Sequence, residues 1–227
     1  MFDVGETLVH PAPSFAELFA SIVRDAGHVR DTAAVLDASA AVRRGFSDAS
    51  RDGELWTLTA ESSRAFWLGV YGRMLETLDL PSADGLREQL YSGFTDLANY
   101  ALFDDVPEAL DDLASAGVTL GIVSNFEAWL DDLLARLGVR DRFQVQVISG
   151  LEGLEKPDPR IYVLALERAG VVAEATAFVG DNPEFDIAPP ASLGMYPVLI
   201  DRRERHAEHP GVRITDLRDL VDVLEAA

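Results

Sequence analysis

Four short stretches of the sequence combine an apolar run with polar side chains that could do chemistry. A carboxylate can act as a nucleophile or bind a cation, a hydroxyl can hold an anion, and an ammonium can neutralise developing negative charge. Each stretch alone is better explained as a turn, a helix start or a solvated surface residue. Their order, after successive apolar runs, indicates one shared site. The stretches are FDVGETL with Asp3 and Thr7, GIVSN with Ser124 and Asn125, LEKPDP with Lys156, and FVGDNPEFD with Asp181 and Asp186.

Lys156 stands out by composition. It is the only lysine in the chain, which otherwise carries eighteen arginines. A lysine ammonium is a compact, movable point charge, whereas an arginine guanidinium is a planar fork of fixed geometry. Its place just before a Pro-Asp-Pro turn makes Lys156 a candidate site residue, with the alternative that chance left a single lysine there.

Residues 101–227 contain the helices and strands that must position these side chains, because helical periodicity alternates there with short apolar runs. Such runs are typical of parallel strands buried on both faces. We predict a doubly wound, Rossmann-like α/β domain with its ligand site at the carboxyl ends of the strands. Helices are predicted at 102–117, 127–138, 158–170, 185–194 and 215–227, and strands at 118–125, 143–150, 175–182 and 196–201.

Residues 10–100 differ, because helical periodicity continues through them without a strand pattern. We therefore expect an α/β core domain made of residues 1–9 and 101–227, with an all-helical domain of residues 10–100 inserted near its start. The helices are predicted at 14–27, 31–50, 60–80 and 84–100.

Composition excludes several classes of protein. The net charge of −20 argues against a nucleic-acid partner, since binding there depends on Lys and Arg neutralising phosphates. With no cysteine, the chain has neither disulfides nor a cysteine-based zinc site. No apolar run reaches the roughly 18 residues of a membrane span, and no signal peptide is visible. We expect a soluble, cytoplasmic protein without a membrane partner, as a monomer or a homodimer.

Taken together, the four stretches resemble the motifs of the haloacid dehalogenase superfamily. That family has a strand followed by Asp-x-Asp-Gly-Thr, a strand ending in Ser or Thr, a Lys before a helix, and Gly-Asp followed closely by a second Asp. FDVGETL, VSN, EKPDP and GDNPEFD match these motifs in order, and the resemblance covers essentially the whole chain. The helical insertion resembles the family's helical cap. The motifs are specific for the superfamily and weakly informative about the substrate.

The resemblance implies a Mg²⁺-dependent hydrolase, specifically a phosphatase acting on a small phosphorylated metabolite through an aspartyl intermediate. Asp3 would be the nucleophile. Mg²⁺ would be held by Asp3, Asp181 and the main-chain carbonyl of Gly5, with Asp186 as a further ligand or a partner of one.

The remaining motif residues would bind the substrate. Ser124 and the backbone N–H of Asn125 would hold a phosphate oxygen that is not transferred, and Thr7 would contribute to the same binding. Lys156 would lie between the nucleophile and the phosphoryl group, as a catalytic and substrate-binding cation.

The sequence departs from the family pattern at Gly5. The family's phosphatases carry a second Asp there, which protonates the leaving oxygen and then activates water, and such a group contributes about 10²–10⁴-fold. Hydrolysis of the aspartyl intermediate should therefore be slow. Glu6 is not expected to replace this group, since consecutive side chains of an extended strand point to opposite sides.

The chain start is the second departure. Only Met1 and Phe2 precede Asp3, whereas a strand usually has about 5–6 residues. We expect a natural chain that begins upstream of Met1.

Two other functions stay open. A 2-haloacid dehalogenase also uses an Asp nucleophile and a Lys, and a halide leaving group needs no acid at Gly5. It also needs no metal, which argues against it in view of the acidic loop around Asp181. The other alternative is a phosphometabolite-binding homologue without turnover.

Overall fold

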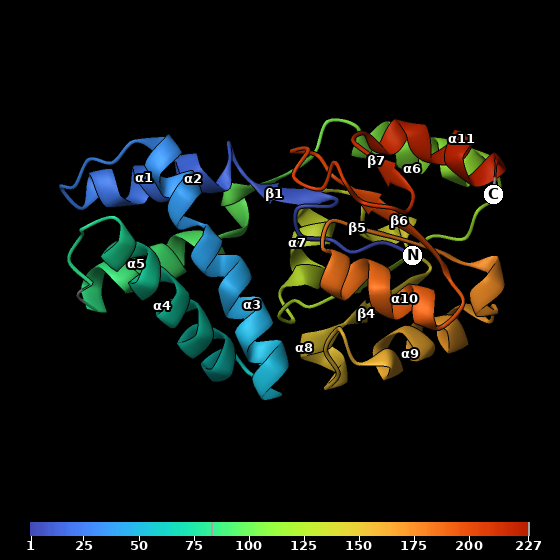
Figure 1. The fold of residues 1–227 in the computed structure, drawn as a ribbon, viewed down its shortest axis with the longest axis horizontal. Helices are drawn as coiled ribbons and strands as arrows, with labels where there is room; N and C mark the ends of the chain where they lie inside the picture. Colours follow the sequence, from blue (N-terminus) through green and yellow to red (C-terminus); the bar gives the residue numbers. More distant parts are fainter. Residues whose placement is uncertain (83, 227) are drawn as a thin grey trace. The chain divides into compact units, whose positions relative to one another are not determined.

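The computed structural model describes residues 1–82 and 84–226. They form two compact units, one of Met1–Val9 with Leu102–Ala227 and one of His10–Ala101. Figure 1 shows the helices and strands of both units.

The first unit is built on a parallel sheet. Adjacent strands pair in parallel from β3 to β4, from β5 to β6 and from β6 to β7. Phe2 joins the two halves, because it forms parallel bridges to Ile122 of β3 and to Val179 of β5. The spatial order is therefore β4, β3, the segment at Phe2, β5, β6 and β7. The strands are β3 (Gly121–Ser124), β4 (Val145–Ile148), β5 (Ala177–Gly180), β6 (Tyr196–Ile200) and β7 (Arg213–Ile214).

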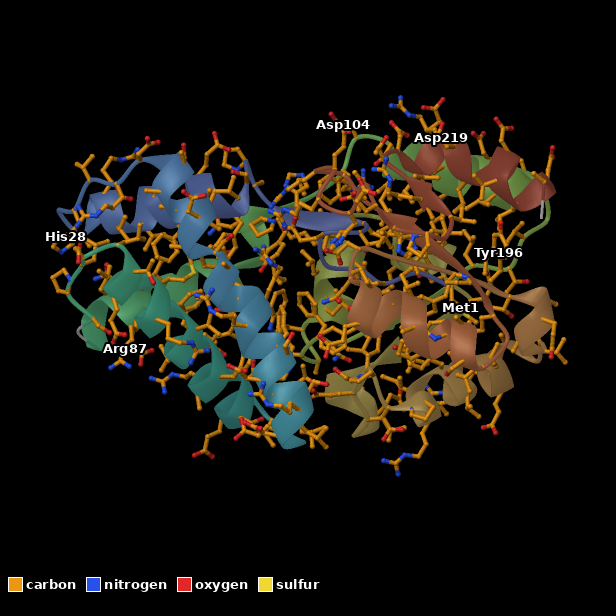
Figure 2. The ribbon with its side chains drawn as sticks, viewed as in Figure 1. Met1, His28, Arg87, Asp104, Tyr196 and Asp219 are labelled. Carbon is orange, nitrogen blue, oxygen red and sulfur yellow. The ribbon has the colours of Figure 1, made fainter. Side chains whose placement is uncertain are left out.

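The segment at the chain start is short but is held on both sides. The N–H of Phe2 donates to the carbonyl of Gly121, and the N–H of Asp3 donates to the carbonyl of Val179, both at 2.8 Å. Met1 lies within the α/β unit (Figure 2). Burial lowers the pKa of its α-amino group to about 5. Asp3 is thus fixed at the carboxyl end of a segment in mid-sheet.

Helices cover both faces of the sheet (Figure 1). The face beneath α9 is closed by Ile161, Tyr162 and Ala165, which pack with Val123 and Phe178 of the sheet. On the opposite face α6 and α11 pack together. The helices are α6 (Val106–Ser115), α7 (Leu130–Arg136), α8 (Ser149–Glu152), α9 (Pro159–Ala169), α10 (Ala188–Ser192) and α11 (Leu220–Glu225). Shorter turns occupy Arg140–Arg142, Ala173–Ala175, Pro183–Ile187 and Leu217–Asp219.

The second unit is helical. The hydroxyl of Ser14 and the carboxylate of Asp31 cap α1 and α2 by accepting backbone N–H groups. The helix predicted at 31–50 is divided at Ser39, whose hydroxyl donates to the carbonyl of Leu36. The helices are α1 (Phe15–Asp25), α2 (Thr32–Ala38), α3 (Ala40–Asp52), α4 (Ala60–Thr77) and α5 (Asp84–Thr95), followed by a 3₁₀ turn at Leu97–Asn99.

The core of the helical unit contains Phe19, Tyr71, Met74 and Leu90, all of them fully buried. Two short strands, β1 (Val9–Pro11) and β2 (Tyr100–Leu102), pair where the chain leaves and re-enters the α/β unit. The predicted α/β fold with an inserted helical module is confirmed.

Among the residues that the structure describes, no helix combines the length and the apolar character needed to cross a membrane.

Candidate active site

The carboxyl ends of three neighbouring strand segments bring polar residues to one edge of the sheet. Asp3 follows Phe2, Ser124 ends β3, and Asp181 follows β5. Because Phe2 pairs with both β3 and β5, these residues lie at the point where the sheet reverses its winding. Open α/β sheets bind their ligands at this crevice.

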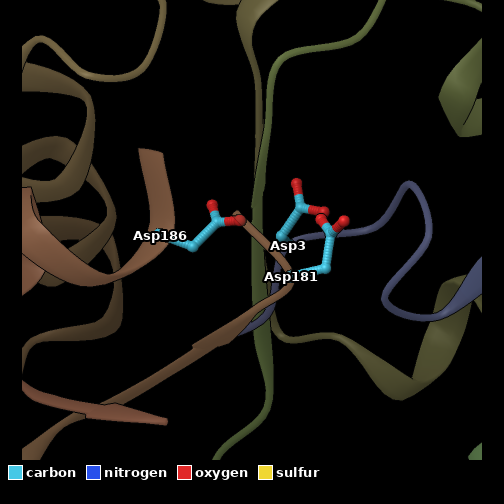
Figure 3. A group of neighbouring side chains, drawn as sticks. All are labelled: Asp3, Asp181 and Asp186. Atoms are coloured by element: carbon cyan, nitrogen blue, oxygen red, sulfur yellow. The ribbon is translucent and has the colours of Figure 1, made fainter. Parts of the chain in front are cut away.

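Three carboxylates converge there. Oxygen atoms of Asp3, Asp181 and Asp186 all lie within 4.8 Å of one another. Figure 3 shows the Asp186 carboxylate pointing toward the other two from the turn that follows β5. Asp3 and Asp186 are buried, while Asp181 is partly exposed. A cation that reached this cluster would meet oxygen ligands from three side chains.

Lys156 neutralises part of this charge. Its Nζ lies 2.7 Å from Oδ1 of Asp3 and 2.6 Å from Oδ1 of Asp186, and the lysine is only 4% exposed. Nζ is also 5.8 Å from the centre of the Phe178 ring. One ammonium among three carboxylates leaves excess negative charge in a site with little water.

The pKa values reflect this crowding. Withdrawal of the Asp181 carboxyl from water, reinforced by the charges of Asp3 and Asp186, raises its pKa well above the usual range. Burial also raises the pKa of Asp186, although Lys156 opposes the shift. For Lys156, burial alone lowers the pKa, but the charges of Asp186 and Asp3 outweigh burial and raise it. The lysine therefore stays charged, and the carboxylates would gain from a further cation.

Two hydroxyl groups orient Asp3. Thr7 Oγ1 donates to Oδ2 of Asp3, and Ser124 Oγ donates to Oδ1, each at 3.2 Å. Both residues are almost completely buried. The first loop is tight enough to turn Thr7 back onto Asp3, since the N–H groups of Thr7, Leu8 and Val9 all donate to the carbonyl of Val4.

The Asn125 side chain is directed at the Lys156 backbone. Its Nδ2 donates to the carbonyl of Lys156 at 2.8 Å, and its Oδ1 accepts the N–H of Lys156 at 2.6 Å. The side chain is therefore engaged with the protein, and contact with a ligand would fall to the backbone N–H of Asn125.

Gly180 is needed because Asp186 approaches its backbone closely. A Cβ at position 180 would lie 2.5 Å from Cβ and from Oδ2 of Asp186. Oδ2 of Asp186 also accepts a hydrogen bond from the N–H of Asn182, in the same loop after β5, at 3.0 Å. The Gly-Asp pattern is thus explained by packing within the site.

The residues after Asp3 do not continue a strand. Glu6 has φ of 57°, in the left-handed region, so the alternation expected of an extended strand does not describe its side chain. Its carboxylate forms an ion pair with Arg203 at 2.8 Å. Its charge also adds to the raised pKa of Asp181. The assumption that side chains alternate along an extended strand at Glu6 is therefore wrong. Gly5, where the family's phosphatases carry the second Asp, has no side chain.

Comparison with known proteins connects this geometry to a family. The model of the haloacid dehalogenase-like hydrolases matches residues 1–194. The chain belongs to this family. It is therefore a hydrolase of the haloacid dehalogenase superfamily, as the motifs predicted.

Among the relatives of known sequence, some are named for the family alone and others for a specific activity. The mouse (Mus musculus) haloacid dehalogenase-like hydrolase domain-containing protein 3 is 29% identical over 100% of this chain and 94% of its own. A phosphoserine phosphatase of Thermus thermophilus is 30% identical over 69% of this chain and 66% of its own.

Solved structures show the same fold. The haloacid dehalogenase-family hydrolase YfnB from Bacillus subtilis, bound to magnesium, has a TM-score of 0.77 at 19% identity, covering 99% of this chain and 96% of its own. The L-2-haloacid dehalogenase RSc1362 has a TM-score of 0.75 at 20% identity, covering 99% and 96%. At these identities the likeness concerns the fold alone.

Some residues around the site of this haloacid dehalogenase-like hydrolase escaped the sequence analysis. Tyr162 is fully buried in α9, and its hydroxyl donates to the carbonyl of Phe185 next to Asp186. Burial raises its pKa. In the sequence, Tyr162 is one of several residues on the apolar face of a predicted helix. Its hydroxyl, which needs a hydrogen-bond partner when buried, was the one signal of a polar contact.

Arg202 was missed as well. Its guanidinium donates to the carbonyl of Thr7 and to Oδ2 of Asp105, both at 2.8 Å, and stacks over the Phe103 ring at 3.9 Å. The basic run directly after β6, in a chain of strongly negative charge, was the signal that could have indicated this support.

Proposed function

We propose that this hydrolase is a Mg²⁺-dependent phosphatase that acts on a small phosphorylated metabolite. The observation that carries the proposal is the group of three carboxylates within 4.8 Å of one another, with Lys156 bonded to two of them. A phosphate ester brings further negative charge, which this site could accept only with a cation. The name of the Thermus phosphoserine phosphatase supports the phosphatase activity, and the magnesium bound to YfnB supports the choice of cation.

The donor set fits Mg²⁺. Magnesium prefers oxygen ligands and is usually held by one or two carboxylates together with substrate phosphates and water. Asp3, Asp181 and Asp186 offer such oxygens, and the main-chain carbonyl of Gly5 is proposed as a further ligand. When bound, Mg²⁺ would supply charge neutralisation for the phosphoryl oxygens.

In the first half-reaction an oxygen of Asp3 attacks phosphorus. A bond forms between this oxygen and phosphorus, and the bond from phosphorus to the leaving oxygen breaks. The hydroxyl of Ser124 would exchange its contact with Asp3 for one with a phosphoryl oxygen, which the backbone N–H of Asn125 would also hold. Thr7 keeps the Asp3 carboxylate oriented, and Lys156 offsets the charge.

In the second half-reaction water attacks phosphorus and restores the Asp3 carboxylate, releasing inorganic phosphate. The leaving oxygen of the first step needs a proton, and the water of the second must lose one. Gly5 can do neither, so substrates whose leaving group is stable as an anion are preferred and the aspartyl phosphate is long-lived. In this scheme the α/β unit carries the chemistry and the helical unit is the cap.

Gly5 also favours a second candidate, a 2-haloacid dehalogenase, because a halide leaves without a proton. The two reactions differ in their need for metal. Dehalogenation would release chloride from 2-chloropropionate equally with Mg²⁺ or with EDTA, whereas phosphate release would stop in EDTA.

A panel of phosphate esters tests the proposal. Acetyl phosphate and p-nitrophenyl phosphate should be cleaved with Mg²⁺ by the native chain and not by Asp3→Asn. Equal, background rates for both proteins would instead indicate a binding protein without turnover. Chloride release without metal would indicate the dehalogenase.

A further inference from the structure

The geometry points to Asn125 as a positioning residue for Lys156. We propose that the carboxamide of Asn125 fixes the backbone of Lys156, so that the ammonium is delivered between Asp3 and Asp186. The kinetic part of the argument rests on the proposed phosphatase function, and the structural part does not.

One backbone hydrogen bond closes the turn around Lys156, from the N–H of Asp158 to the carbonyl of Glu155 at 2.9 Å, but the N–H and carbonyl of Lys156 itself are paired by a side chain. The residue lies between α8 and α9, outside any helix or strand, and Pro157 after it has no N–H to contribute. A buried backbone needs partners for both its N–H and its carbonyl. The Asn125 carboxamide provides both, with an acceptor at 2.6 Å and a donor at 2.8 Å. An asparagine side chain carries this pair of groups, and an aspartate does not.

Fixing the backbone matters because the side chain beyond it is long. A lysine side chain has about 2 kcal/mol of rotamer entropy, and its charge must reach two carboxylates at once. A displaced Lys156 backbone would draw the ammonium away from contacts of 2.7 Å to Asp3 and 2.6 Å to Asp186. A shift of about 1 Å at a catalytic group can cost about 10²-fold in rate.

The position of Asn125 also links two parts of the site. It directly follows Ser124, whose hydroxyl contacts Asp3. The end of β3 therefore places the hydroxyl group and, through the Asn125 carboxamide, the lysine. Next to it, the N–H of Phe126 donates to Ser149 Oγ at 2.9 Å, which ties the same segment to the start of α8.

Because Lys156 is the only lysine, its environment can be observed alone. The protein is produced without any tag that contains lysine and is labelled with ¹³Cε-lysine. Its spectrum then shows one lysine side-chain NMR signal. In the native protein this signal should be displaced from that of free lysine. In Asn125→Ala it should move toward the free-lysine position or broaden, and in Asn125→Asp, which keeps one of the two hydrogen bonds, it should move less.

Gln144→Ala is the matched control. Gln144 Oε1 also accepts a backbone N–H, that of Leu120 at 2.8 Å, but at the opposite end of the strands. This variant should leave the lysine signal in place. An unchanged signal in folded Asn125→Ala or in Asn125→Asp would overturn the proposal, as would an equal displacement in Gln144→Ala.

The rate of labelling by acetyl phosphate gives the functional measurement. We expect Asn125→Ala to lower the maximal rate about tenfold, with a smaller change in the concentration giving half-maximal rate. A maximal rate equal to that of Gln144→Ala would contradict the positioning role. If the native chain is not labelled at all, the proposed phosphatase function fails, while the NMR signal still decides the role of Asn125.

Discussion

Gly180 and Asp186 lie so close that no side chain fits between them. A Cβ added to Gly180 would be 2.5 Å from Cβ of Asp186, a separation that real Cβ atoms essentially never show. Asp186 in turn holds Lys156 and the N–H of Asn182. Packing at Gly180 thus sets the place of Asp186, which lies in the turn after β5, the strand that pairs with the segment preceding Asp3.

Gly180→Ala should therefore displace the Asp186 carboxylate. We expect about 1–3 kcal/mol of lost stability, typical of overpacking, and at least about tenfold slower phosphoryl transfer. Thermal unfolding and acetyl phosphate labelling measure the two effects. Gly69→Ala is the control, since the nearest atom to its added Cβ is Arg73 Nη1 at 3.7 Å. Equal behaviour of the two variants would contradict the packing argument.

Gly5→Asp should restore the missing proton-transfer group. A Cβ at this position meets nothing within 4 Å, and Gly5 does not have positive φ, so the side chain can be accommodated. We expect the hydrolysis of the aspartyl phosphate to become about 10²–10⁴-fold faster. The decay of the isolated, labelled protein measures this step. Gly5→Asn has nearly the same shape without the acid, so equal decay of the Asp and Asn variants would refute the assignment.

Mg²⁺ should stabilise the folded chain, because the site proposed for it consists of carboxylates that only the fold brings together. At a concentration a hundredfold above its dissociation constant, the gain is about 2.7 kcal/mol. Differential scanning calorimetry with Mg²⁺ and with EDTA measures it. Asp181→Asn should lose most of the gain, whereas an exposed control, Asp37→Asn, should keep it. A gain that survives in Asp181→Asn would place the cation elsewhere.

Asp201 should make stability depend on pH. Burial alone raises the pKa of this carboxyl, but the N–H groups of His206 and Arg205, each at 2.8 Å, outweigh it and hold the pKa below the ordinary value of 3.8. A carboxyl with a lowered folded-state pKa stabilises the fold above its unfolded pKa and loses this contribution as pH falls below it.

Asp201→Asn should accordingly cost about 1–3 kcal/mol at pH 7, and the difference from the native chain should shrink as pH falls below 3.8. Urea unfolding at pH 7 and at pH 3 measures both values. A difference that stays constant between these pH values would show that the carboxylate charge is not responsible.

The order of strands and helices in the α/β unit could be predicted because apolar runs and helical periodicity alternate clearly after residue 101. The segment at Phe2 could not be described in this way, since its place in mid-sheet depends on bridges to Ile122 and Val179. The two-residue strand β7 is too short to leave a pattern. Ser39, which divides a predicted helix, carries no signal as strong as glycine or proline.

For the site, the sequence indicated which residues gather and not how each is used. Asp3, Lys156 and Asp186 were found because their types and order fit one chemistry. The direction of the Asn125 side chain depends on a backbone more than thirty residues away in the chain, and no local pattern reports it. Likewise, the left-handed conformation of Glu6 is set by the tight loop after Asp3, where the sequence suggested a continuing strand.

The central claim is that Asp3 becomes covalently phosphorylated with the help of a divalent cation held beside it. Incubation with acetyl phosphate and Mg²⁺, followed by rapid acid quenching and mass spectrometry of the peptides, tests it most directly. The account predicts one added phosphoryl group on the peptide that contains Asp3, absent in EDTA and in Asp3→Asn. Brisk phosphate release with no adduct at any time, or an adduct that persists in Asp3→Asn, would contradict it.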